Sequence, residues 1–170
     1  MAERPPEDPR VRVGRLYDAH GASLYRYAVM LLADTAAAED AVHQVFAALL
    51  RPSAAERIDD AAHYLRRAVR NECFSMLRRY RSRAETNGAA PLLESIAAEP
   101  AGATPDERLT LERALRSLPP EQREVVHLHL FEGLTFQEIA DAAHESINTI
   151  ASRHRYALAR LREVLGSRHG

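Results

Sequence analysis

The sequence predicts an all-α protein: two small helical domains joined by a flexible linker, the C-terminal one with a helix-turn-helix. Three observations support this fold class. Apolar residues recur at helical spacing through most of the 170 residues, and no useful length alternates as a strand would. A stretch rich in proline and glycine interrupts the pattern once. A short amphipathic helix, a tight turn and a longer amphipathic helix end the chain.

The first domain is predicted at residues 1–83. Its helical stripes run through three segments, "VGRLYDAHGASLYRYAVMLL", "TAAAEDAVHQVFAALL" and "AAHYLRRAVRNECFSMLRRYRSR". Asp34 or Thr35 can cap the second helix, and Pro52 ends it because proline lacks the N–H that a helix interior needs. The apolar positions of the third segment leave its arginines mostly outward, which predicts a helix with one basic face.

The linker is predicted at residues 84–105, where "PLLESIAA" can form a short helix. Charge is distributed unevenly around it. Residues 84 to 107 hold five acids and no base, whereas residues 57 to 83 hold eight arginines against three acids. The last eighteen residues hold five arginines against one acid. Two separate basic segments, each on a predicted helix, favour a nucleic-acid partner over an ordinary solvated face.

The second domain is predicted at residues 106–170. Thr135 and Glu138 fit a capping box that starts a short helix, and Ser146 caps a longer helix after a tight turn. The second helix of such a helix-turn-helix lies in the major groove of DNA. Its inward stripe is predicted to be mostly apolar: Ile147, Ile150, His154, Ala157 or Leu158, Leu161 and Leu165. The outward side chains, with Arg155 at the border, are predicted to meet phosphates and base edges: Asn148, Thr149, Ser152, Arg153, Tyr156 and Arg160.

Several other classes of protein do not fit the sequence. No apolar run approaches the roughly 18 residues of a spanning helix, and the N-terminus is polar, so we expect neither membrane insertion nor a signal peptide. Cys73 is the only cysteine, which excludes an internal disulfide and fits a reducing cytoplasm. His127 and His129 point in different directions on a helix and make a poor metal pair. Without a phosphate loop or nucleophile elbow, we expect no cofactor and no enzymatic activity.

The chain as a whole resembles the extracytoplasmic-function (ECF) sigma factors. "LYDAHGASLYRYAVMLLAD", "AEDAVHQVFAALL" and "YLRRAVRNECFSMLRRYR" are similar to region two of that family. "LRSLPPEQREVVHLHLFEGLTFQEIADAA" with "SINTIASRHRYALARLR" is similar to region four. The resemblance implies that the first domain docks on the β′ clamp helices of core RNA polymerase and opens the minus-ten promoter element. It also implies that the second domain reads the minus-thirty-five element, that the β flap is a contact, and that an anti-sigma factor is a further partner.

The resemblance also implies which residues make these contacts. In the polymerase-binding helix, Glu39, Asp40, Val42 and Phe46 match the family motif, whereas His43 and Gln44 stand where glutamine and an acid are usual. The exposed polar residues of this helix are the expected polymerase contacts: Glu39, Asp40, His43 and Gln44. Five residues of the strand-opening helix are expected at the minus-ten element: Arg67, Arg70, Asn71, Arg78 and Arg79. There, arginines would hold the backbone while Asn71 and nearby aromatics handle unstacked bases. Tyr64 replaces a common tryptophan and Ser75 a common aspartate.

The helix-turn-helix departs from the family pattern in four places. His144 stands in the turn where glycine is usual, at a site that often requires positive φ, which costs on the order of 1 kcal/mol for a residue with a side chain. Glu145 replaces an apolar residue, Ala151 a common lysine and His154 a common leucine. These changes do not alter the fold prediction, but they alter which base contacts the family pattern predicts.

Two other classes of protein remain as alternatives. A helix-turn-helix repressor or activator acting without core polymerase explains the second domain, but not the basic helix of the first. A helical adaptor that binds no DNA explains the amphipathic helices, but not two separated arginine faces. Dependence on core polymerase distinguishes the three.

Overall fold

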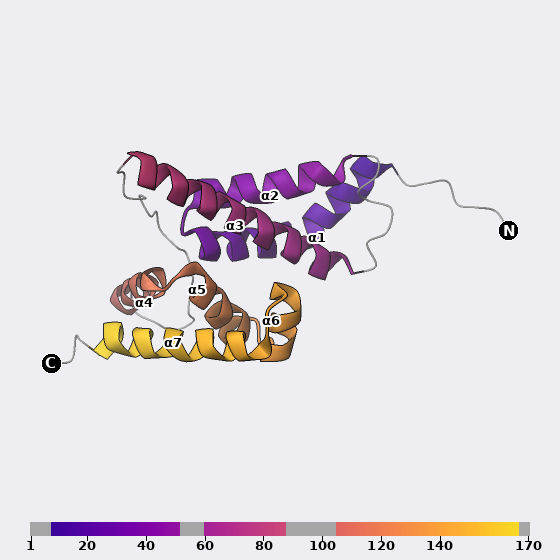
Figure 1. The fold of residues 1–170 in the computed structure, drawn as a ribbon. Coiled ribbons are helices and arrows are strands. Elements are labelled where there is room, and N and C mark those ends of the chain that lie inside the picture. The colour runs from indigo at the N-terminus through magenta and orange to yellow at the C-terminus, as the bar shows by residue number, and fades with distance from the viewer. Residues whose placement is uncertain (1–7, 52–59, 88–104, 167–170) are drawn as a thin grey trace. The chain divides into compact units, whose positions relative to one another are not determined.

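The computed structural model describes residues 8–51, 60–87 and 105–166, and within these ranges the chain is helical with no strand (Figure 1). The all-α prediction is confirmed. The helices follow one another along the chain as α1 (Pro9–Leu32), α2 (Thr35–Leu49), α3 (Ala61–Asn87), α4 (Pro105–Ser117), α5 (Pro120–Val126), the π-helix η1 (His127–Phe131), α6 (Phe136–Ala143) and α7 (Ile147–Gly166).

The helices divide into two compact units. The first contains α1 up to Ala28, α2 from Ala36 and α3, and the second contains α4 to α7 together with the short stretch Val29–Thr35. Helix α3 ends at Asn87, past the predicted domain end at residue 83. Most of the expected linker, its expected short helix, and Pro52 lie outside the described residues.

The core of the first unit is built by one face of each of its three helices. Leu24 and Tyr27 of α1 are almost fully buried, at 4% and 2% exposure. The buried positions of α2 recur at helical spacing: Ala37, Ala38, Ala41, Val42, Val45, Phe46 and Leu49. Helix α3 adds a third set: Leu65, Val69, Cys73 and Met76. Cys73 is therefore a buried thiol that packs as a small hydrophobe.

The second unit is held together by the face that α7 buries. Its cluster joins side chains from α4, the turn after α4, α5 and α7: Ala114, Leu115, Leu118, Val126, Ala157 and Leu161. Helix α5 begins with Pro119 at the N-cap and Pro120 in the first turn, where the missing N–H of proline has no partner to lose.

Beyond α5 the chain widens into a π-helix, which the sequence did not predict. Helix η1 ends where the Glu132 N–H donates to the His127 carbonyl at 3.2 Å, and the Leu134 N–H donates to the Leu128 carbonyl at 2.9 Å. Gly133 ends the segment with φ at +72°, a left-handed conformation that glycine adopts without steric cost. No helix within the described ranges has both the length and the apolarity to span a membrane.

Candidate nucleic-acid interface

The interface in the second unit begins with the short helix α6, and its predicted capping box is confirmed. The Thr135 N–H donates to Oε2 of Glu138 at 2.7 Å, and the Glu138 N–H donates to Oγ1 of Thr135 at 3.2 Å. The Thr135 N–H, together with the Thr135 hydroxyl, which donates to the same carboxylate oxygen at 2.8 Å, stabilises the charged carboxylate and holds the pKa of Glu138 below its usual value. Local hydrogen bonds therefore fix where α6 starts.

The turn between α6 and α7 is a left-handed cap at His144. Its φ and ψ are 53° and 42°, the left-handed conformation predicted for this position. The following N–H, that of Glu145, donates to the Ala140 carbonyl at 3.0 Å and so ties the turn to α6. Ser146 then caps α7 as predicted, because its Oγ accepts from the Thr149 N–H at 3.1 Å.

Helix α7 buries a narrower stripe than the sequence suggested. Ile150, Ala157 and Leu161 are buried as predicted. The prediction that Ile147 and Leu165 also pack inward is wrong: they are 44% and 36% exposed, because they lie at the two ends of the helix, beyond the buried stripe.

The residues predicted to contact DNA fall into two groups along α7. Four are exposed: Asn148, Arg155, Tyr156 and Arg160. Three are half-buried: Thr149, Ser152 and Arg153. Arg155, expected at the border, is fully on the exposed side, and its guanidinium lies 5.2 Å from the centroid of the Tyr156 ring. The two form one flat cationic surface.

Arg153 has an acidic partner that sequence reasoning did not assign. Its Nη2 donates to Oε1 of Glu145 at 3.0 Å, with the two side chains 23% and 37% exposed. The other terminal nitrogen, Nη1, is buried without a hydrogen-bond partner in the described structure. The guanidinium is therefore held against the turn.

Three rings pack α7 against the segment before it. His154 lies 5.1 Å from His129 and 5.1 Å from Phe136, and the His129 and Phe136 centroids are 4.6 Å apart. Nδ1 of His129 is 2.7 Å from the Leu134 carbonyl oxygen, so this nitrogen carries the proton and donates. Desolvation, followed by the charge of His129, lowers the pKa of His154. His154 therefore packs as a neutral ring, where the family usually has leucine.

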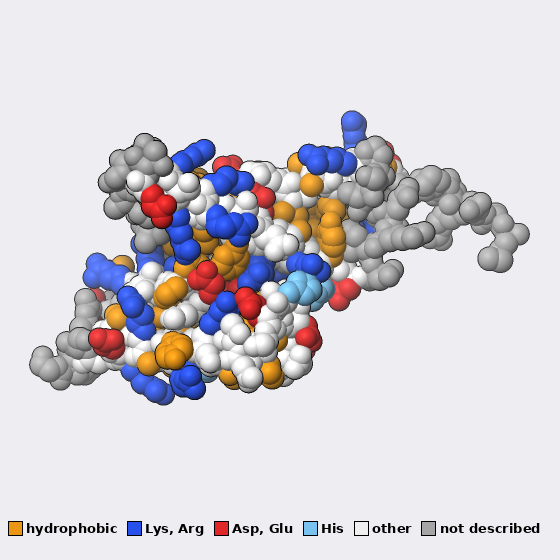
Figure 2. All heavy atoms as spheres, in the orientation of Figure 1, with side chains coloured by type: hydrophobic (Ala, Val, Ile, Leu, Met, Phe, Trp, Pro, Cys, Tyr) orange, Lys and Arg blue, Asp and Glu red, His pale blue; other side chains and the backbone are white. Residues whose placement is uncertain are grey.

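In the first unit, α3 presents the second basic face. Figure 2 shows arginine side chains, in blue, along α3 on the face in view. Arg67, Asn71 and Arg78 are exposed, and helical spacing puts them in one stripe with Tyr64, which is 42% exposed. Sequence reasoning did not select Tyr64 among the aromatics of this helix. Its spacing from Arg67 and Asn71 nevertheless indicates that the three side chains share one face.

The remaining predicted arginines of α3 are already engaged within the helix. The Arg70 guanidinium lies over the Phe74 ring at 4.6 Å from its centroid. Arg79 donates to Glu72 at 2.9 Å and to Ser75 at 3.2 Å. Part of the arginine charge is thus compensated locally, and Arg67 and Arg78 remain the exposed arginines of the stripe.

The predicted docking helix α2 has a sharply divided surface. Its four predicted contact residues are all exposed: Glu39, Asp40, His43 and Gln44. They alternate in pairs with buried residues that pack into the core of the first unit: Ala41, Val42, Val45 and Phe46. The effect of substituting one of the four exposed residues on binding can therefore be measured without loss of folding.

No cluster of three or more potential metal-ligating side chains occurs in the described parts of the chain. His127 and His129 contact different partners. His127 lies 3.2 Å from Glu132 and stacks on Phe131, whereas His129 belongs to the ring cluster with Phe136 and His154.

Comparison with known proteins identifies the family. Residues 16–83 match the model of Sigma-70 region 2, and residues 114–163 match that of Sigma-70, region 4. The ECF RNA polymerase sigma factor SigL of Mycobacterium tuberculosis is 32% identical over 157 residues, which cover 88% of this chain and 86% of SigL. The chain belongs to the ECF RNA polymerase sigma factors. The sigma factor SigM of the same organism is 29% identical over 158 residues, covering 92% of this chain and 79% of SigM.

Solved structures share the fold of this ECF sigma factor. The sigma factor RpoE, in complex with the anti-sigma factor NepR from Bartonella quintana, matches with a TM-score of 0.73 at 23% identity, covering 90% of this chain and 96% of RpoE. CnrH, in complex with the cytosolic domain of CnrY, matches with a TM-score of 0.59 at 21% identity, covering 93% and 90%.

The family resemblance predicted from the sequence is thereby confirmed. As an ECF sigma factor, the protein directs RNA polymerase to promoters. A repressor that acts without polymerase and an adaptor that binds no DNA are not supported.

Proposed function

We propose that the three exposed faces divide the work of initiation: α2 docks on the β′ clamp helices of core RNA polymerase, α3 handles the opened minus-ten element, and α7 reads the minus-thirty-five element. Residues 1–83 and 106–170 would act as separate functional domains joined by the linker. The observation that carries this proposal is that each compact unit exposes its own arginine-bearing helix face.

The proposal for α2 rests on its exposed polar residues. Asp40 and Gln44 are one turn apart, and Glu39 and His43 form a second such pair beside them. An acidic face of this kind favours a basic partner surface and speeds the encounter with it. The buried residues beneath it keep the helix rigid, so docking requires little rearrangement.

The proposal for α3 rests on the stripe of Tyr64, Arg67, Asn71 and Arg78. Single strands are bound by cations that track the backbone and by aromatic faces on which bases stack. Arg67 and Arg78 would hold phosphates, the Tyr64 ring would stack with an unpaired base, and Asn71 would hydrogen-bond to base edges. The helix would thus stabilise an open promoter without catalysing any reaction.

In the second unit, the N-terminal half of α7 would enter the major groove and the β flap would be a further contact of this unit. Asn148 and Ser152 would face base edges together with Thr149, whereas Arg155 and Arg160 would meet phosphates. The chemistry of RNA synthesis would remain with the polymerase, and the protein would act in the cytoplasm.

An anti-sigma factor is a further proposed partner. RpoE and CnrH, whose fold this chain shares, were each solved with a bound protein. Such an inhibitor would compete with core polymerase for the free protein. A purified candidate inhibitor that, at saturating concentration, leaves the binding of this protein to core polymerase unchanged would not be such an anti-sigma factor.

Promoter opening by α3 is tested with holoenzyme reconstituted on a promoter that it transcribes. Thymine reactivity to permanganate reports strand opening. Tyr64→Ala and Asn71→Ala should each lower the reactivity, whereas Tyr64→Phe should retain it because the stacking ring remains. Arg83→Ala is the matched control. Arg83 is exposed, but it lies five full helical turns from Leu65 and so on the side of α3 that carries this buried residue, away from the stripe. Wild-type reactivity in Tyr64→Ala and Asn71→Ala would contradict the proposal for α3.

A further inference from the structure

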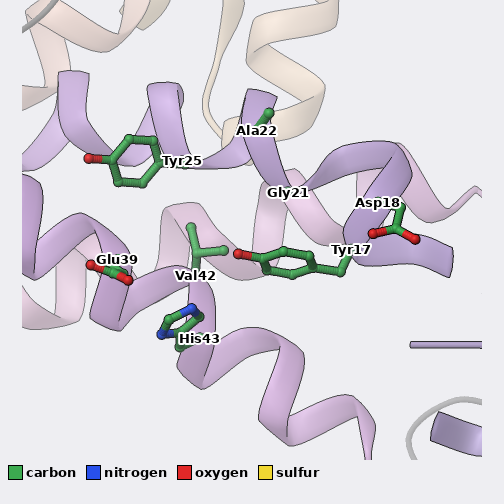
Figure 3. Close-up of a pocket in the computed structure, with 8 residues that line it drawn as sticks. All are labelled: Tyr17, Asp18, Gly21, Ala22, Tyr25, Glu39, Val42 and His43. Carbon is green, nitrogen blue, oxygen red and sulfur yellow. The ribbon is translucent and has the colours of Figure 1, made fainter. Parts of the chain in front are cut away.

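A pocket of about 520 Å³ lies between α1 and α2 in the first unit (Figure 3). Eight residues from these two helices line it: Tyr17, Asp18, Gly21, Ala22, Tyr25, Glu39, Val42 and His43. Gly21 lies beside the ring of Tyr17, since a Cβ at this position would come to 3.4 Å from the ring, an ordinary contact distance. The pocket therefore belongs to the contact between α1 and α2.

The Tyr17 ring forms the centre of the pocket. It lies between the two helices with its hydroxyl directed toward Val42 (Figure 3). Phe46 packs edge-on against the ring, with centroids 5.0 Å apart, and His43 stacks at 6.5 Å. These contacts fix the orientation of the ring, although Tyr17 remains 43% exposed. A rigid, exposed aromatic surface is therefore available to a partner.

The charges around this ring are acidic. The carboxylates of Asp18 and Glu39 lie on either side of it in Figure 3. The eight lining residues include no lysine or arginine. Cations bind favourably over the face of a tyrosine ring and beside carboxylates. The chemistry of the pocket therefore suits a positively charged group.

Among cations, an arginine side chain fits the lining best. Its planar guanidinium stacks on an aromatic ring and hydrogen-bonds to carboxylates at its edge. Its methylene stem needs an apolar wall, which Ala22 and Val42 supply. A volume of about 520 Å³ accommodates one such long side chain.

We propose that this pocket receives an arginine side chain from the core polymerase surface that docks on α2. The inference rests on the proposed docking and adds the α1 side of the contact to it. Glu39 and His43 belong both to the exposed face of α2 and to the pocket lining. A basic surface that covers this face of α2 therefore also covers the pocket.

The test measures the affinity of the full-length protein for core polymerase by fluorescence anisotropy at two salt concentrations. Asp18→Asn should weaken binding about tenfold and reduce its salt dependence, because one charge–charge contact is lost. Tyr17→Leu should also weaken it about tenfold, whereas Tyr17→Phe should bind as the wild type does because the ring face is kept. Glu85→Gln is the matched control, as an exposed acid of α3 outside the pocket.

Wild-type affinity and salt dependence in Asp18→Asn would overturn the inference. Asp18→Asn removes an exposed carboxylate, so we expect no folding defect. Unchanged thermal midpoints would verify this for the variants at Asp18 and Tyr17. If the wild-type protein itself fails to bind core polymerase, the proposed docking fails. If the wild type binds and the pocket variants bind equally well, only the arginine site is wrong.

Discussion

Arg153 and Glu145 form an ion pair across the turn of the helix-turn-helix, with Nη2 of the arginine 3.0 Å from Oε1 of the glutamate. Glu145 stands where the family usually has an apolar residue. The arginine expected to read a base is thus oriented by an acid that the family pattern does not supply. The sequence preference of the second unit should depend on both residues.

The first prediction concerns Arg153. To reach a base, the Arg153 guanidinium must exchange the Glu145 carboxylate for the base edge. Arg153→Ala should therefore cost about 1 to 3 kcal/mol on the preferred upstream element and relax the preference at one or two base pairs, because that base contact is lost. Glu145→Gln should relax the same base pairs while raising affinity for all duplexes, since a repulsive carboxylate is removed. Affinities across single-base variants of the element measure both effects. Wild-type preference in Arg153→Ala would mean that another face of α7 enters the groove.

Arg160 should behave differently from Arg153. It is exposed and lies two turns farther from the N-terminus of α7, where it is expected to meet a phosphate. Arg160→Ala should therefore weaken binding to all duplexes alike, and reduce the slope of log affinity against log salt by about one phosphate contact. A salt titration on two unrelated duplexes measures this. A change in sequence preference would instead place Arg160 at a base edge.

The docking face of α2 yields a prediction with a built-in control. Asp40→Arg should weaken core polymerase binding and leave the thermal midpoint unchanged, because the side chain is exposed. Phe46, on the opposite face, is 5% exposed, so Phe46→Ala should lower the free energy of unfolding by roughly 3 to 5 kcal/mol. Unchanged core affinity in Asp40→Arg would remove Asp40 from the contact.

His154 makes the stability of the second unit depend on pH. Because its pKa is lowered in the native state, the unfolded chain binds the proton more readily. Stability should therefore be complete above about pH 6.5 and fall as the pH drops below that value. His154→Leu should remove this contribution and raise stability by about 1 kcal/mol, since Nε2 has no hydrogen-bond partner in the described structure.

Thermal unfolding between pH 5 and pH 8 measures this effect. His63→Leu is the control, because His63 is exposed in the first unit, whereas the three packed rings belong to the second unit. An identical pH dependence in the wild type and His154→Leu would show that another group controls it.

The sequence predicted the features that depend on local spacing. The alternating burial of α2 follows from its apolar period, and the Thr135–Glu138 capping box and the Ser146 cap follow from residues within one turn of each other. The left-handed turn at His144 was predicted from its place in the family motif.

The features that were missed depend on packing between distant residues. The Arg153–Glu145 pair joins side chains eight positions apart across a turn, and no spacing rule predicts it. The π-helix after Val126 has no distinctive residue pattern. The ring of Tyr17 becomes a binding surface only because α1 and α2 bring it against His43 and Phe46.

The central claim is that this protein gives core RNA polymerase its promoter specificity. Run-off transcription with purified core polymerase on a genomic promoter library tests it most directly. We expect discrete transcripts that require both the protein and core polymerase, and that are lost with Asp40→Arg. No specific transcript at saturating protein, together with tight binding of duplex DNA by the protein alone as a dimer, would contradict the account and identify a repressor.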